Sequence, residues 1–144
     1  MIRLIGIFLF SITAPVYATE IVRQHGFEVQ VQPFPSTILA QEVALVNGFK
    51  RSRRQALINV VVLKVQNDGQ ARGPVPALVT GVSKNLIGQR QNLVFREIEE
   101  GKDAIYYLAP VEVISEELIQ ITLQVVPKGQ KPIDIKFEHR VYVD

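Results

Sequence analysis

The sequence contains no cysteine and only two histidines, His25 and His139. Without cysteine the chain has no disulfide bond, no thiol nucleophile and no cysteine-based metal site. The first and last strands of a sandwich can lie side by side, but two histidines with no carboxylate at ligand spacing do not indicate a metal site. We therefore expect no metal and no other cofactor, and a domain that its core alone stabilises.

Several catalytic motifs are also missing. The serines after residue 18 do not lie in a Gly-x-Ser-x-Gly turn, and no glycine-rich phosphate loop occurs. These absences predict a protein that is not an enzyme. One catalytic alternative stays open, because a glycan hydrolase needs only a pair of carboxyl groups. The acidic residues near predicted turns that could supply this pair are Glu97, Glu99, Glu100, Asp103, Glu116 and Glu117.

The chain begins with the pattern of a signal peptide. Arg3 is followed by an apolar run from Leu4 to Ile12, and Val16-Tyr17-Ala18 places small residues where a signal peptidase cleaves. We predict a signal peptide at residues 1–18, export to the periplasm, and a single mature domain at residues 19–144. The alternative is a retained N-terminal anchor, but the run is shorter than the about 20 apolar residues that span a bilayer. No other transmembrane segment is predicted.

Neither sign of charge dominates the mature chain. Removing Arg3 with the signal peptide leaves 15 of the 16 basic residues against 14 acidic ones. A nearly neutral domain does not attract nucleic acid as a whole, so any basic character must be local. We expect no nucleic-acid partner.

Alternation of apolar and polar residues predicts a half-buried strand at residues 27–32. Pro33-Phe34-Pro35 should end it, because proline cannot donate to a strand ladder. A short helix follows, which Ser36 or Thr37 caps and Gly48 closes. The apolar residues spaced for one face of this helix are Ile38, Leu39, Val43 and Val46.

The longest apolar strand is predicted at residues 57–63, where both phases are apolar except at Asn59. Such a strand is covered on both faces, and the preceding helix can supply one cover. Pro74 and Pro76 favour an edge position for the next strand, and Pro110 should break or bend a later one. These later strands are predicted at residues 75–84, 93–95, 104–109, 119–125 and 133–143.

Short strands separated by frequent turns favour an all-β fold. The specific prediction is an antiparallel immunoglobulin-like β-sandwich with one short helix before the central strand. A closed barrel of the lipocalin type is the alternative, but the helix and the short chain favour the sandwich.

Four blocks of residues carry a family resemblance. They are Gly48-Phe49 with Arg51-Ser52, Arg54 and Ala56 to Val60; Gly88-Gln89-Arg90 with Leu93 and Phe95-Arg96-Glu97; Gly101 with Ala104 to Ala109; and Phe137 with Val141 to Asp144. Together they resemble the proteobacterial family known as domain of unknown function 4426, which consists of small exported proteins, over essentially all of residues 19–144. The resemblance implies a Gram-negative periplasmic β-sandwich and no catalytic residue.

The strongest local charge lies in the segment Lys50-Arg51-Ser52-Arg53-Arg54. Closely spaced guanidinium groups bind phosphate, carboxylate or an anionic membrane surface, so Lys50, Arg51, Arg53 and Arg54 are candidate binding residues. The alternative is a solvated loop whose arginines form ion pairs with Glu97, Glu99 or Glu100.

Three further residues are candidates for a contact surface. Tyr106 and Tyr107 point to opposite faces of one strand, so one belongs to the core and the other is exposed. We assign Tyr107 to the contact surface, together with Arg140 and Tyr142 from the outward face of the last strand.

The sequence therefore predicts a non-enzymatic binding module of the periplasm. Its partner would be a protein or an anionic envelope component, contacted through the basic loop or by strand addition at an open sheet edge. The glycan hydrolase mentioned above and a structural or chaperone-like role are the alternatives.

Overall fold

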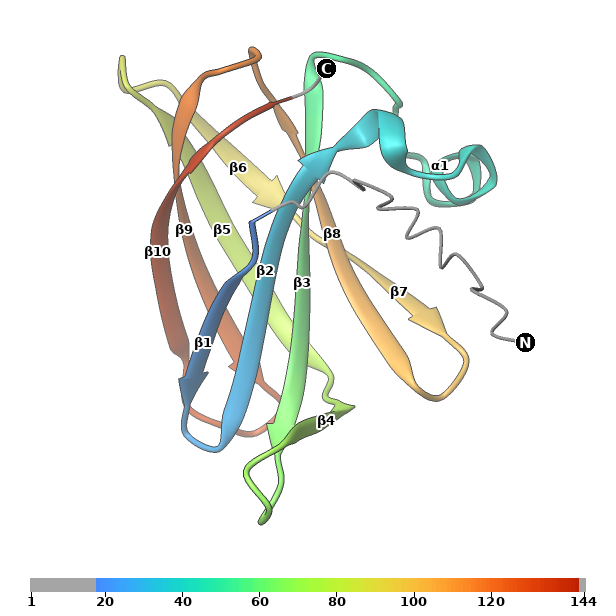
Figure 1. The fold of residues 1–144 in the computed structure, drawn as a ribbon, viewed down its shortest axis with the longest axis vertical. Coiled ribbons are helices and arrows are strands. Elements are labelled where there is room, and N and C mark those ends of the chain that lie inside the picture. The colour runs from blue at the N-terminus through green and yellow to red at the C-terminus, as the bar shows by residue number, and fades with distance from the viewer. Residues whose placement is uncertain (1–17, 143–144) are drawn as a thin grey trace, which may run out of the picture.

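A computed structural model describes residues 18–142, which form two antiparallel sheets packed face to face (Figure 1). The six-stranded sheet contains, in spatial order, β1 (Glu20–Gln24), β2 (Phe27–Pro35), β3 (Gln55–Val65), β8 (Ala104–Glu112) and β7 (Arg96–Glu100), with β4 (Ala71–Pro74) paired to β3. The four-stranded sheet contains β10 (Ile133–Arg140), β9 (Leu118–Pro127), β5 (Ala77–Asn85) and β6 (Arg90–Val94). The predicted antiparallel β-sandwich is confirmed. The predicted signal peptide lies outside the described residues, apart from Ala18.

The core lies between the two sheets and follows the alternation of the sequence. β3 contributes Ile58, Val60 and Val62 from the six-stranded sheet, and these residues are buried. β9 contributes Ile121 and Leu123 from the other sheet, and both are also buried. The alternation predicted for the two last strands is confirmed, although β10 ends at residue 140. Burial of these aliphatic side chains, about 1.5–3 kcal/mol for each, is the main favourable term of this fold.

β3 is also covered on its outer face, where Leu57 is buried and Asn59 and Val61 are half-buried. There Leu57 packs with Ala44 of the helix α1 (Gln41–Asn47), with Phe49 in the following loop and with Leu108 of β8. The prediction that the preceding helix covers the central strand is therefore confirmed. This second cluster fixes α1 and the loop that follows it against the sheet.

The helical segment is shorter and more broken than predicted. A 3-10 turn, η1 (Ser36–Ile38), is followed by extended backbone at Leu39, and α1 begins only at residue 41. Gly48 ends α1 in the left-handed region at φ 71°, as predicted. Because the break resets the helical phase, Ala44 is the buried residue of α1, whereas Val46 is 84% exposed. The predicted helix face was wrong at Val46.

Pro33 and Pro110 do not end their strands, although β2 does end within the predicted proline segment, at Pro35. β2 continues through Pro33 to residue 35, and β8 continues through Pro110 to residue 112. The pairing explains why. β1 pairs with β2 only as far as Val31, and β7 pairs with β8 only as far as Leu108. Beyond these points the strands have one open side, where a missing N–H group leaves no ladder bond unmade.

The order of strands in the second sheet also differs from the prediction. β5 lies between β9 and β6, so the strand after Pro76 is an interior strand and its predicted edge position is wrong. The segment that was predicted as one strand around Leu93 and Phe95 forms two strands in different sheets. β6 belongs to the four-stranded sheet, and after Phe95 the chain continues as β7 in the six-stranded sheet.

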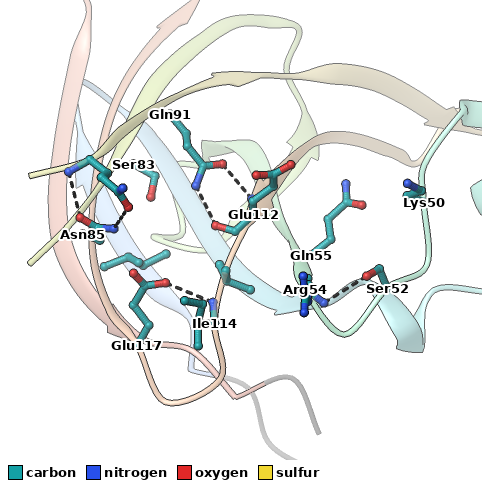
Figure 2. A pocket seen from close by; sticks show the side chains of 13 residues that line it. Lys50, Ser52, Arg54, Gln55, Ser83, Asn85, Gln91, Glu112, Ile114 and Glu117 are labelled. Atoms are coloured by element: carbon teal, nitrogen blue, oxygen red, sulfur yellow. Dashed lines mark hydrogen bonds between the residues drawn. The ribbon is translucent and has the colours of Figure 1, made fainter. Parts of the chain in front are cut away.

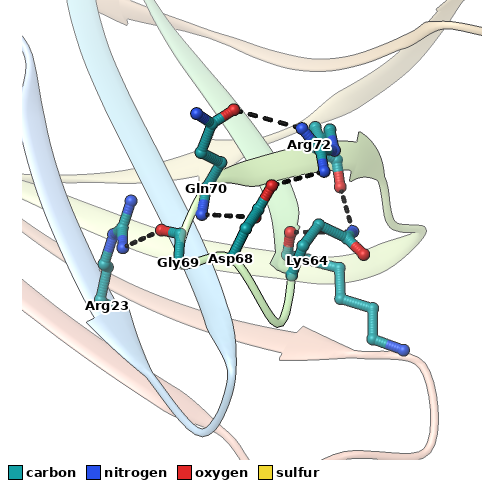
Figure 3. A network of polar contacts seen from close by, with 7 residues as sticks. Arg23, Lys64, Asp68, Gly69, Gln70 and Arg72 are labelled. Atoms are coloured by element: carbon teal, nitrogen blue, oxygen red, sulfur yellow. Dashed lines mark hydrogen bonds and ion pairs between the residues drawn. The ribbon is translucent and has the colours of Figure 1, made fainter.

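A polar network joins β1 to the turn between β3 and β4 (Figure 3). Arg23 Nη1 donates to the carbonyl oxygen of Gly69 at 2.8 Å, and Arg23 Nε lies 2.8 Å from Glu28 Oε1. Glu28 is largely buried, and its second oxygen accepts a hydrogen bond from Gln30 at 2.8 Å. The Gln30 hydrogen bond, followed by the Arg23 contacts, holds the pKa of Glu28 below its ordinary value.

This shift predicts a pH-dependent contribution of Glu28 to stability. Because the folded-state pKa is lowered, the carboxylate stabilises the fold above the pKa of the unfolded chain, and this stabilisation is lost as the pH falls through the folded-state pKa. We expect Glu28→Gln to lower the free energy of unfolding at neutral pH, and the difference from the parent to shrink at about pH 3. Urea unfolding at both pH values measures this. Glu20→Gln, at an exposed position of β1, is the control; an equal difference for Glu28→Gln at both pH values would contradict the prediction.

Gly81 allows β5 and β9 to pack closely. A Cβ atom at this position would lie 2.5 Å from Leu123 Cδ2 and 2.8 Å from the carbonyl oxygen of Thr122. The backbone oxygen cannot move aside as a side chain can, so we expect Gly81→Ala to lower the free energy of unfolding by about 1–3 kcal/mol. Thermal or urea unfolding checks this, with Thr80→Ala at the exposed neighbouring position as the control. Equal stability of Gly81→Ala and the parent would show that the strands can move apart.

Candidate functional site

The predicted basic cluster divides into parts that point in different directions. Lys50 and Arg54 line a pocket at one end of the sandwich. Arg51 turns the other way and donates a hydrogen bond to the carbonyl oxygen of Thr37 at 2.7 Å. Arg53 is exposed and does not line the pocket. The structure therefore brings two of the four predicted cations together.

The expected ion pairs between this loop and the acids of residues 97–100 are not formed. Within residues 18–142, the ion pairs join Arg23 to Glu28 and Arg72 to Asp68. The alternative interpretation of the loop as one held down by Glu97, Glu99 or Glu100 is wrong. A buried serine holds the loop instead. Ser36 Oγ donates to the carbonyl oxygen of Ser52 at 2.8 Å and accepts from the Ser52 N–H group at 2.9 Å.

The pocket opens where β3 and β9 begin and where β5 and β8 end (Figure 2). Its volume is about 440 Å³, and residues from both sheets line it. Lys50 and Arg54 supply positive charge, and Glu112 and Glu117 supply negative charge. The remaining lining residues are Ser52, Gln55, Ser83, Asn85, Gln89, Gln91, Val113, Ile114 and Ile119. The pocket is thus rich in hydrogen-bonding groups of both kinds, with charges of both signs.

Gln91 joins the two sheets at the back of this pocket. Its Nε2 donates to the carbonyl oxygen of Glu112 at 2.7 Å, and its Oε1 accepts from the Glu112 N–H group at 2.8 Å. β7 pairs with β8 only as far as Leu108, so on the side of β8 that faces β7 the backbone of Glu112 has no neighbouring strand. The side-chain amide of Gln91 offers one donor and one acceptor, as a paired peptide group does, and takes the place of the missing strand.

Two further loops around the pocket are held by local hydrogen bonds. In the β5–β6 turn, Asn85 Nδ2 donates to Gln89 Oε1 at 2.8 Å, and the Gln89 N–H group donates to Asn85 Oδ1 at 2.9 Å. In the loop after β8, the Ile114 N–H group donates to Glu117 Oε2 at 3.1 Å. Hydrogen bonds within each loop therefore hold two of the walls of the pocket.

A second hollow lies on the outer face of the six-stranded sheet. It is an apolar groove of about 350 Å³ between α1 and the strands β3, β7 and β8. Its walls include Phe34, Leu39 and Leu108. Asn59 Oδ1 is buried in the groove wall and accepts no hydrogen bond from the described residues.

The family model of a domain of unknown function, DUF4426, matches residues 22–144. The chain belongs to the DUF4426 family. No curated protein matches the sequence.

Solved structures resemble this DUF4426 protein over nearly their whole length. A DUF4426 family protein from Pseudomonas aeruginosa is 32% identical with a TM-score of 0.76, and the match covers 88% of this chain and 96% of that one. FetP of uropathogenic E. coli, expressed recombinantly in the periplasm, is 14% identical with a TM-score of 0.63, covering 88% and 95%. A copper-bound variant of FetP is 15% identical with a TM-score of 0.65, covering 88% and 96%. The FetP matches show the fold alone.

The assignment of Tyr107 to an exposed contact surface was wrong. Tyr107 lies opposite Val60 of β3 and is only 5% exposed. Its hydroxyl accepts from the Ala77 N–H group at 2.8 Å and donates to Glu97 Oε1 at 3.0 Å, and burial raises its pKa. Tyr106, on the other face of β8, lines the apolar groove. Alternation showed that the two tyrosines face opposite ways, but not which face of β8 meets the second sheet.

Arg140 and Tyr142 line a different hollow from Lys50 and Arg54, with a volume of about 320 Å³. Tyr142 is 59% exposed, as predicted. Arg140 Nη1 donates to the carbonyl oxygen of Glu116 at 2.7 Å, so it fastens the loop after β8 to the last strand. His139 lines the same hollow, and burial lowers its pKa. His25 lies in the β1–β2 turn at the other end of the sandwich (Figure 1).

The DUF4426 pocket depends on residues that the sequence did not single out. Gln55, Ser83, Asn85, Gln89, Gln91 and Glu112 come from four different strands and one turn. Each is an ordinary polar residue at a strand end, and no motif links them. The sequence signals for the pocket were the basic segment, which supplied Lys50 and Arg54, and the set of candidate acids, which supplied Glu117.

The role of Gln91 in joining the sheets can be tested directly. Gln91→Ala removes both hydrogen bonds to the backbone of Glu112, and we expect the free energy of unfolding to fall by about 1 kcal/mol, since water can reach these groups. Amide hydrogen exchange at Glu112 should become faster. Asn92→Ala changes the exposed neighbouring amide residue and should leave both measurements unchanged. Unchanged exchange at Glu112 in Gln91→Ala would contradict the bridging role.

Proposed function

We propose that this DUF4426 protein is a non-enzymatic binding module of the periplasm. Its ligand is a polar molecule of about sugar size that carries a phosphate or carboxylate group. The ligand binds in the pocket that Lys50 and Arg54 line at one end of the sandwich. The observation that carries the proposal is the convergence of Lys50 and Arg54 with side-chain amides from both sheets around about 440 Å³. That volume falls within the roughly 300–1,000 Å³ of typical small-molecule sites.

The lining chemistry defines the ligand class. Arg54 offers a planar fork of donors that suits phosphate or carboxylate, and Lys50 offers a point charge. Glu112 and Glu117 would repel a bare anion but accept hydrogen bonds from hydroxyl groups. A ligand with an anionic group joined to hydroxyl groups can bind both the cations Lys50 and Arg54 and the carboxylates of Glu112 and Glu117. Phosphorylated polyols and acidic sugars of the cell envelope have this chemistry.

Several observations support the periplasmic location. The sequence predicts a signal peptide at residues 1–18, and FetP, which shares the fold, was expressed in the periplasm. In the part of the chain from residue 18 to residue 142, no helix has the length and apolar character needed to cross a bilayer. The absence of cysteine also suits an oxidising compartment.

Binding is favoured over hydrolysis by the placement of the acids. Glu97, Glu99, Glu100 and Asp103 lie on or next to the β7–β8 hairpin, while Glu116 and Glu117 lie in the loop after β8 at the other end of the sandwich. Of these six candidates only Glu117 lines the pocket. The other acid there is Glu112, so a carboxyl pair in the pocket would consist of Glu112 and Glu117, and Glu117 already accepts the Ile114 N–H group. Copper is bound by the FetP variant, but among residues 18–142 no three metal-ligating side chains gather, and the proposal includes no metal.

The proposal is tested by titrating the protein with two defined probes, glycerol 1-phosphate and N-acetylmuramic acid. Nuclear magnetic resonance should show shifts at the side-chain amides of Gln55 and Gln91 with at least one probe. Because charged hydrogen bonds contribute about 1.5–3 kcal/mol, Arg54→Gln should weaken binding at least about tenfold. Lys50→Gln should act in the same direction.

Arg53→Gln is the matched control, because it removes one arginine from the same loop outside the pocket. It should bind both probes as the parent does. Equal weakening by Arg53→Gln and Arg54→Gln would mean that the loop acts through general charge and not through the pocket. Absence of shifts with both probes would contradict the ligand class and favour a structural or chaperone-like role. Turnover of a glycan that is lost in Glu117→Gln would contradict the non-enzymatic assignment.

A further inference from the structure

The tip of the β5–β6 hairpin presents two large aliphatic side chains to solvent. Leu86 and Ile87 are each 80% exposed, so the fold buries neither of them. The backbone beneath them is well ordered by hydrogen bonds: the Asn85 N–H group donates to the Gln89 carbonyl at 3.0 Å, and the Gly88 N–H group donates to the Asn85 carbonyl at 3.1 Å. The tip is thus a fixed convex point with an apolar end.

Two cations lie in the strands next to this apolar tip, one on each side of the turn. Lys84 of β5 and Arg90 of β6 are partners across the hairpin, and both are exposed. Like charges opposite each other destabilise a strand pair. This pair therefore works against the stability of the hairpin on its own, and a negatively charged surface beyond the tip would offset the repulsion.

We propose that the hairpin tip is a membrane-docking element that inserts into the surface of an anionic phospholipid bilayer. Leu86 and Ile87 enter the boundary between headgroups and acyl chains, where aliphatic side chains lose their contact with water. Lys84 and Arg90 then lie at the level of the phosphate groups, which they attract. A protruding apolar tip with Lys84 and Arg90 beside it fits a deformable bilayer better than it fits a preformed groove on a protein.

The surroundings of the tip support this orientation. The loop after β8 lies at the same end of the sandwich (Figure 1) and carries Ile114, which is 73% exposed. Few acids lie near Lys84 and Arg90. Glu138 of β10 is in the same cross-strand row, where Gln120 of β9 separates it from Lys84. Glu116 and Glu117 lie in the neighbouring loop, where Glu117 is bonded to the backbone.

Vesicle sedimentation tests the proposal with the predicted mature chain, residues 19–144. The vesicles consist of phosphatidylcholine with and without phosphatidylglycerol. The parent should bind the vesicles that contain phosphatidylglycerol, and added salt should weaken the binding. Leu86→Ser with Ile87→Ser should lower the partition coefficient by roughly tenfold or more. Lys84→Gln with Arg90→Gln should lower it by roughly tenfold on the anionic vesicles only. All these positions are exposed, so the melting temperatures should stay close to that of the parent.

The matched control is Leu45→Ser with Val46→Ser, which removes an adjacent aliphatic pair of similar exposure from α1. This variant should bind vesicles as the parent does. Failure of the parent to bind anionic vesicles, or equal binding by the tip variant, would overturn the proposal. Equal losses in the tip and α1 variants would overturn it too, since any exposed aliphatic pair would then suffice. Lys50 and Arg54 of the pocket are unchanged in all these variants. Titration of the tip variant with glycerol 1-phosphate separates the two proposals: it should still bind this probe while it no longer binds the vesicles.

Discussion

The burial of β3 on both faces is the constraint on which the other features depend. Its inner face is part of the core between the sheets, and its outer face is closed by Leu57 packing with Phe49 and Ala44. Arg96 of β7 lies over the Phe49 ring, 5.5 Å from its centre, and donates a hydrogen bond to the carbonyl oxygen of Asn47. The loop that enters β3 is therefore held through Phe49, which packs with Leu57 and Ala44 and makes a cation–π contact with Arg96. Lys50 follows Phe49 directly, so its position at the pocket follows from the burial of its neighbour.

Alternation predicted the parts of the fold that local chemistry decides. A strand with one face in the core must place apolar residues at every second position, and Ile119, Ile121, Leu123 and Val125 do so. The left-handed turn at Gly48 is also local, because its conformation suits glycine more than any other residue. Such signals require no knowledge of the neighbouring strands.

The errors arose where the neighbouring strands decide the outcome. Proline at position 110 is tolerated because β7 ends its pairing two residues earlier, which no local pattern shows. The chain changes sheet at Phe95, in a segment that still looks like continuous strand. The choice between Tyr106 and Tyr107 likewise depends on which face of β8 meets the other sheet. In each case the missing information is the pairing, which brings together residues far apart in the sequence.

The candidate site shows the same division between local and non-local information. Five successive residues predicted a basic surface, but the backbone directs Arg51 towards Thr37 and leaves Arg53 in solvent, so only Lys50 and Arg54 reach the pocket. Their partners come from strand ends of both sheets, and the sandwich gathers them only after it has folded.

The β5–β6 turn links the two proposed surfaces. Asn85 and Gln89 line the pocket, and Leu86 and Ile87 stand between them in the sequence at the exposed tip. If the tip rests in a bilayer, the pocket therefore opens close to the lipid headgroups. A phosphate joined to hydroxyl groups is the chemistry of a phospholipid headgroup as well as of a free polyol phosphate. The pocket residues and the tip residues share no side chain, but they lie on the same turn, which two hydrogen bonds between Asn85 and Gln89 hold together.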